Sequence, residues 1–158
     1  MDIVLHTQQE EAKDRALGGK ASGLLHLEAQ GAQVPPFLVV APEVFYRHLP
    51  KAEWDAFLAE QATVDPEKPQ QTYPAAERLC EAIMAGTLDD TVIGILEEGL
   101  GKIPSKHYAI RSSMLGEDSA EHSFAGQLES FLFQETVDDV KSSIKRCWCS
   151  ALQPRVLA

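Results

Sequence analysis

Apolar side chains gather in four short segments of the chain, each bounded by polar residues, glycine or proline. We expect these segments to be β-strands, and they are residues 3–5, 37–40, 108–111 and 128–133. The first is short enough to be an edge strand, and the second is a continuous apolar run typical of a buried strand. The last should place its aromatic and aliphatic side chains on alternating faces.

Between these segments, apolar residues recur at the spacing of amphipathic helices. Helices are expected over 21–31, 43–48, around 54–61, over 74–85, from Asp89 or Asp90 onward, and over 136–152. In the first of them Leu24, Leu25 and Leu27 form one stripe, and Thr136 is placed to cap the last. The pattern predicts a mixed α+β fold, with a small sheet flanked by helices and a helical region over residues 54–102.

Composition narrows the class of protein. The chain has 158 residues with 14 Lys+Arg and 24 Asp+Glu, so its formal net charge is 14 − 24 = −10. An acidic chain lacks the basic footprint of a nucleic-acid-binding protein. No apolar run approaches the roughly 20 residues that span a bilayer. The first residues do not resemble a signal peptide, so we expect a cytoplasmic protein. The length fits one domain, residues 1–158.

Cysteine and histidine do not form a recognisable metal or disulfide pattern. The three cysteines, Cys80, Cys147 and Cys149, are too few for a disulfide framework, and we expect reduced thiols. The five histidines share no metal-ligand spacing, so no metal-ligating residue is predicted. The glycine pattern is not a P-loop, because Asp14 and Ala21 stand where the motif needs glycine and Ser or Thr.

Two segments have the residues that bind anions. Gly18-Gly19-Lys20 precedes a predicted helix, where paired glycines let backbone N–H groups approach an anion and the lysine adds a charge. Arg111-Ser112-Ser113 stands at the carboxyl end of a predicted strand, where open α/β sheets collect ligands, and a guanidinium there can fork onto a phosphate. Each could instead be structural: a glycine turn with a surface lysine, and an arginine in an ion pair.

The long segment 112–127 contains a third candidate. Small residues in Ser123-Phe124-Ala125-Gly126-Gln127 would let a loop fold over phosphates, although a tight turn before the next strand is the structural alternative.

Taken together and in this order, these motifs resemble the N-terminal part of the nucleotide-binding domain of phosphoenolpyruvate synthases and pyruvate phosphate dikinases. Rifampicin phosphotransferases share that domain. The likeness extends over almost the whole chain, and its most specific part is the block from Arg111-Ser112-Ser113 to Ala125-Gly126-Gln127. The helices between about Trp54 and Lys102 contribute nothing diagnostic.

The resemblance implies the first lobe of an ATP-grasp-like fold, with ATP and Mg²⁺ held between two lobes. By this likeness Lys20 and Arg111 would act on the phosphates during catalysis. The residues implied in ATP binding are Gly19, Lys20, Arg111, Ser112, Ser123, Ala125, Gly126 and Gln127. The second lobe would supply most magnesium ligands, and a phosphohistidine domain would receive the phosphoryl group.

The sequence also departs from the family pattern. The glycine that the family usually has between Pro36 and Phe37 is missing, and residues matching the second lobe do not follow Ala158. We therefore expect a partial domain, the ATP-binding part of a phosphotransferase that is inactive by itself. The alternative is a non-catalytic binding or interaction module that retains the fold and self-associates through the face that a second lobe would cover.

Overall fold

The computed structural model describes residues 3–5, 17–65, 67–113 and 128–152. The described strands are β1 (Ile3–Leu5), β2 (Leu38–Val40), β3 (Tyr108–Arg111) and β4 (Ser130–Gln134). The described helices are α2 (Gly19–Ala29), α3 (Pro42–His48), α4 (Lys51–Gln61), the short 3₁₀ helix η2 (Pro69–Thr72), α5 (Tyr73–Ala85), α6 (Asp90–Gly101) and α7 (Val137–Ser150). The predicted mixed α+β class is confirmed.

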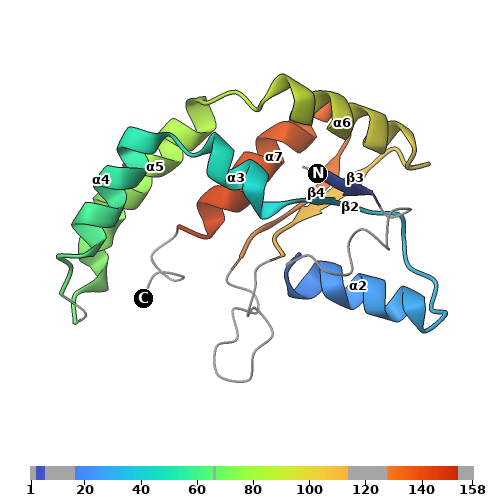
Figure 1. Cartoon of the computed structure of the whole chain (residues 1–158), viewed down its shortest axis with the longest axis horizontal. Coiled ribbons are helices and arrows are strands. Elements are labelled where there is room, and N and C mark those ends of the chain that lie inside the picture. Colours follow the sequence, from blue (N-terminus) through green and yellow to red (C-terminus); the bar gives the residue numbers. More distant parts are fainter. Residues whose placement is uncertain (1–2, 6–16, 66, 114–127, 153–158) are drawn as a thin grey trace.

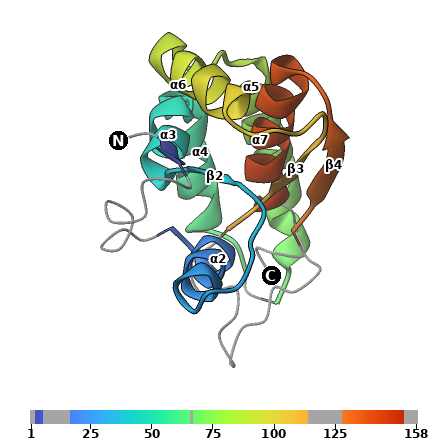
Figure 2. The same cartoon turned by 90° about the vertical axis from the view of Figure 1, so that its right-hand side faces the viewer.

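The described strands form two separate antiparallel pairs. β1 pairs with β2, with Val4 opposite Val39, and β3 pairs with β4, with Arg111 opposite Ser130. In both views α2 lies on one side of these strands and α6 at the opposite end of the molecule (Figures 1 and 2). The strand pairs therefore lie between α2 and the larger group of helices.

Two large apolar clusters hold the helices together. One joins α3, α6 and α7 to the inner sides of β2 and β3 around the buried side chains of Val92, Leu96 and Ile144. The other joins α4, α5 and the end of α7 around Leu79 and Ile83, which are both 0% exposed. The stripes predicted for 74–85 and for the helix after Asp89 account for these contacts.

A third cluster is much smaller and belongs to α2. It consists of Leu17, Ala21 and Val39, with Leu25 and Phe37 packed against them. The predicted stripe on α2 is wrong in one position, because Leu27 is 47% exposed. α2 also begins at Gly19 rather than at Ala21, so both Gly19 and Lys20 lie within its first turn.

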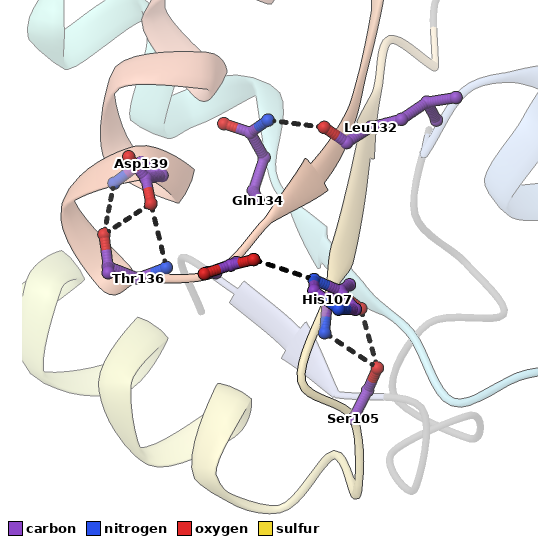
Figure 3. A network of polar contacts seen from close by, with 7 residues as sticks. Ser105, His107, Leu132, Gln134, Thr136 and Asp139 are labelled. Carbon is purple, nitrogen blue, oxygen red and sulfur yellow. Dashed lines mark hydrogen bonds and ion pairs between the residues drawn. The ribbon is translucent and has the colours of Figure 1, made fainter.

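Local capping fixes where the last helix begins (Figure 3). The Thr136 hydroxyl accepts a hydrogen bond from the Asp139 N–H at 3.1 Å, and the Asp139 carboxylate accepts one from the Thr136 N–H at 3.0 Å. The Thr136 hydroxyl also donates to that carboxylate, and these hydrogen bonds lower the pKa of Asp139. The cap is therefore complete at neutral pH and weakens as pH falls through that lowered pKa. Asp89 caps α6 with its side chain alone, which accepts hydrogen bonds from the Thr91 and Val92 N–H groups.

The β3–β4 pair departs from regular alternation. The register shifts between Tyr108 and Ile110, and Phe133 adopts a positive φ of 58°. The expected alternation holds from Ser130 to Leu132, but it is wrong at Phe133, which is 75% exposed whereas Phe131 is half-buried. A bulge of this kind turns side chains away from the face that a flat strand would give them.

Among the described residues, no helix is both long and apolar enough to cross a membrane.

Candidate functional site

The turn before α2 has a backbone that requires glycine. Gly18 has φ +82°, and a Cβ atom built there would lie 1.9 Å from the carbonyl oxygen of Ser113. A side chain would therefore be both strained and in collision with the chain that leaves β3. The glycine allows two segments that are far apart in the sequence to touch.

The Ser113 hydroxyl connects these two segments through hydrogen bonds. It donates to the Leu17 carbonyl oxygen at 2.8 Å and accepts from the Ala21 N–H at 3.1 Å. Gly18, the N-cap residue of α2, has no side chain that could cap the helix, so Ser113 satisfies a first-turn N–H from elsewhere in the chain. We call the contact between residues 17–21 and Ser113 the Gly18–Ser113 junction.

Arg111 and Ser112 lie immediately before this junction. Arg111 ends β3, its side chain is exposed, and it pairs with Ser130 across the ladder, whereas Ser112 is half-buried. The rule that ligands collect at the carboxyl ends of parallel strands does not apply to Arg111 and Ser112, because β3 runs antiparallel to β4. Their position relative to α2 is set by the Gly18–Ser113 junction.

Lys20 is half-buried and close enough to α7 for its charge to act on Cys147. The Cys147 thiol is 7% exposed and donates to the Glu129 carbonyl oxygen at 3.8 Å. Burial raises the pKa of this thiol to about 11, the Glu129 carboxylate adds to the rise, and Arg146 and Lys20 oppose it. Lys20 and Glu129 therefore both lie within electrostatic reach of Cys147.

The predicted site is thus described in part. Leu17 and Ala21, on either side of Gly19 and Lys20, hydrogen-bond to Ser113, which follows Arg111 and Ser112 in the chain. Ser123, Ala125, Gly126 and Gln127 lie outside the described residues. That the charged ends of Lys20 and Arg111 meet one phosphate group stays a prediction. Ser113 belongs to the predicted anion-binding segment, but its role in joining the two segments was not predicted, because its partners lie 92 and 96 positions away and leave no local signal.

A separate groove does not fit a phosphate. It has a volume of about 430 Å³, opens between α5 and α7, and is lined by Cys80, Glu81, Met84, Glu129, Arg146, Cys149 and Ser150. Two of these residues, Glu81 and Glu129, are acidic against one basic residue, Arg146, so the lining is negative on balance, and neither Lys20 nor Arg111 lines the groove. Negative charge would repel a phosphate, so we place the candidate site at the Gly18–Ser113 junction. We call the groove lined by these seven residues the α5–α7 groove.

Metal ligands are not gathered in the part of the chain that the structure describes. There, no group of three or more His, Cys, Asp or Glu side chains could hold a metal ion. These residues therefore do not fit Mg²⁺ as a resident ion, and we derive no step through it.

Comparison with known proteins decides the family. Residues 14–158 match the model of the pyruvate phosphate dikinase AMP/ATP-binding domain. The chain belongs to this family. The kinship predicted from the glycine, arginine and serine motifs is confirmed.

Relatives of this AMP/ATP-binding domain include several curated proteins. A rifampicin phosphotransferase from Streptomyces sp is 29% identical over 159 residues, covering 98% of this chain and 18% of the relative. A phosphoenolpyruvate synthase from Aeropyrum pernix is 27% identical over 150 residues, 90% of this chain and 18% of the relative. The prodigiosin synthesizing transferase PigC from Serratia marcescens is 31% identical over 134 residues, 85% of this chain and 14% of the relative. The chain spans less than a fifth of the length of these relatives.

Proposed function

We propose that this chain binds the phosphates of ATP at the Gly18–Ser113 junction, as the phosphate-binding part of a phosphotransferase. Lys20 and Arg111 would contact the phosphates and take part in transfer. The Gly19 N–H and the Ser112 hydroxyl would donate hydrogen bonds to them. Ser123, Ala125, Gly126 and Gln127 would form the loop that covers them.

The Gly18–Ser113 junction is the observation that carries this proposal. The two motifs with anion-binding chemistry are separated by about ninety residues, yet Ser113 hydrogen-bonds both to Leu17 and to Ala21. Arg111 precedes Ser113 by two residues, so the contact ties the strand that ends at Arg111 to the turn before Lys20. Because the chain belongs to an AMP/ATP-binding-domain family, we propose that the anion bound here is the phosphate chain of ATP.

The electrostatics of the junction suit a polyphosphate. The N-terminal turn of an 11-residue helix, α2, points backbone N–H groups outward and favours negative charge. A lysine and an arginine add two positive charges to this end of an otherwise acidic chain. Phosphoryl transfer asks mainly for positioning and charge neutralisation, which these groups would supply.

The complete reaction needs groups that the described residues do not contain. We propose that ATP is bound together with Mg²⁺, that most magnesium ligands come from a second ATP-grasp-like lobe, and that a phosphohistidine domain accepts the phosphoryl group. The final acceptor is left open, because relatives of the same domain carry names that refer to different substrates.

Lys20→Ala and Arg111→Ala test the proposal in the complete protein encoded by the gene. Each removes a charge-assisted phosphate contact worth about 1.5–3 kcal/mol, so each should weaken Mg-ATP binding about tenfold to a hundredfold in titration calorimetry. Turnover should fall at least as much, because both groups are expected to act on the transferred phosphate.

Matched controls come from α4 and α5. Lys51→Ala and Arg78→Ala remove the same two kinds of charge from exposed ion pairs with Asp55 and Glu60. Exposed pairs contribute little to stability, so both controls should bind ATP as the unaltered protein does. Unchanged ATP affinity and turnover in Lys20→Ala and Arg111→Ala would refute the site.

The alternative, a self-associating module, has one observation in its favour. Leu132 and Phe133 are neighbours on β4 and are 54% and 75% exposed. Exposed apolar pairs on an edge strand promote association. Sedimentation with and without Mg-ATP separates the two functions: a dimer that ignores nucleotide and is lost in Phe133→Ser favours the module, and nucleotide-dependent behaviour favours the ATP site.

A further inference from the structure

Two cysteines from different helices meet between α5 and α7. The Cys80 thiol lies 3.7 Å from the Cys149 carbonyl oxygen, and the Cys149 thiol lies 3.7 Å from the Cys80 carbonyl oxygen. The contact is therefore reciprocal, because each thiol donates to the carbonyl oxygen of the other residue. The residues are 69 positions apart in the chain, so only the packing of α5 on α7 brings them together.

The pair can be reached from solvent, and the third cysteine cannot. Cys80 and Cys149 are half-buried and both line the α5–α7 groove. Cys147 is buried, and its thiol donates to the Glu129 carbonyl oxygen instead. The chain thus contains an accessible pair of cysteines and a buried third cysteine that serves as a control.

We propose that Cys80 and Cys149 are a site of reversible oxidation, at which a hydroperoxide converts the two thiols into a disulfide that joins α5 to α7. This site does not depend on the nucleotide proposal. All three cysteines are free thiols in the structure, so it describes the reduced form.

The reaction balances with one peroxide molecule. The Cys80 thiolate attacks a peroxide oxygen, the O–O bond breaks, and hydroxide leaves to be protonated by the proton that Cys80 released. The resulting Cys80 sulfenic acid is attacked by the sulfur of Cys149; its S–O bond breaks, the S–S bond forms, and the proton of Cys149 leaves with the oxygen as water. The two thiols lose two electrons, and the peroxide is reduced to two molecules of water.

The local electrostatics assign the first step to Cys80. The polar contact with the Cys149 side chain lowers the pKa of Cys80, against the opposing effects of burial and of Glu77. The same contact raises the pKa of Cys149, and burial raises it further. Thiolates are the nucleophiles in such reactions, so Cys80 attacks the peroxide and Cys149 resolves the sulfenic acid.

Peptide mapping tests the proposal in the native protein. After treatment with hydrogen peroxide, alkylation of remaining thiols and trypsin digestion without reduction, peptide 79–102 should be found joined to peptide 147–155, two hydrogens lighter than their sum. Dithiothreitol should separate them. Because peptide 147–155 contains both Cys147 and Cys149, fragmentation between these residues locates the bond in unaltered protein, without any variant.

Serine variants sharpen the result. Cys147→Ser should cross-link as the unaltered protein does, whereas Cys80→Ser and Cys149→Ser should lose the cross-link, with yields lowered about tenfold or more because the reacting thiol is gone. The oxidised protein should also unfold at a higher urea concentration than the reduced protein, since the bond closes a long loop. A bond between Cys80 and Cys147, or separate sulfinic acids on Cys80 and Cys149 with no cross-link, would overturn the proposal.

Discussion

The helical half of the molecule and the Gly18–Ser113 junction are held together by different forces. In α4, α5, α6 and α7, large side chains such as Leu79 and Ile83 are fully buried in extensive apolar clusters. At the junction the apolar cluster has three buried members, and the hydroxyl of Ser113 makes the connection between segments. Hydrophobic burial dominates the first region, and directional hydrogen bonds dominate the second.

The difference separates stability from chemistry. Apolar burial tolerates small shifts, whereas a phosphate site needs N–H groups and charges held at fixed positions. The helical half can therefore supply most of the folding free energy, while the junction supplies geometry. Substitutions in the two regions should accordingly differ in whether they change unfolding, nucleotide binding, or both.

The largest expected effect is in the helical half. Leu79→Ala removes a side chain that is 0% exposed. It should lower the free energy of unfolding by about 2–5 kcal/mol, because it leaves a cavity between α4 and α5. Urea unfolding measures this loss. ATP affinity, measured without urea on the folded protein, should change little. A large loss of affinity would show that the two regions are coupled.

The next effect is at the junction. Gly18→Ala places a Cβ 1.9 Å from the Ser113 carbonyl oxygen at a φ of +82°. Strain and displacement together should cost at least about 2 kcal/mol and should also abolish ATP binding, since the two motifs must separate. Gly23→Ala is the control, because a Cβ there meets nothing within 4 Å. Inside α2 it should stabilise by about 0.5–1 kcal/mol, and equal effects of the two substitutions would contradict the close approach.

The smallest effect comes from Ser113→Ala. It removes the hydroxyl that hydrogen-bonds to the Leu17 carbonyl oxygen and the Ala21 N–H. The free energy of unfolding should fall by about 1–2 kcal/mol. ATP affinity should fall while turnover at saturating ATP changes less, because Ser113 positions the turn and need not touch the phosphate. Ser105→Ala, which removes an exposed hydroxyl paired with the backbone of His107, should change neither quantity.

Features that depend on neighbouring residues were predictable from the sequence. The stripe of α5 with Leu79 and Ile83, the caps at Asp89 and Thr136, and the order of the family motifs all follow from short-range spacing. Periodicity is local, so it marks which face of a helix is apolar without marking which partner covers it. For the same reason the exposure of Leu27 and the irregularity around Phe133 could not be predicted, because each depends on what packs against the strand or helix.

The sequence by itself determined the mixed α+β class, the identity of the helices and the family to which the chain belongs. Only the tertiary structure decided that Ser113 fastens the turn at Gly18 and that Cys80 faces Cys149. These contacts join residues separated by 69 to 96 positions. They arise from the packing of whole elements, which the local pattern of apolar and polar residues does not specify.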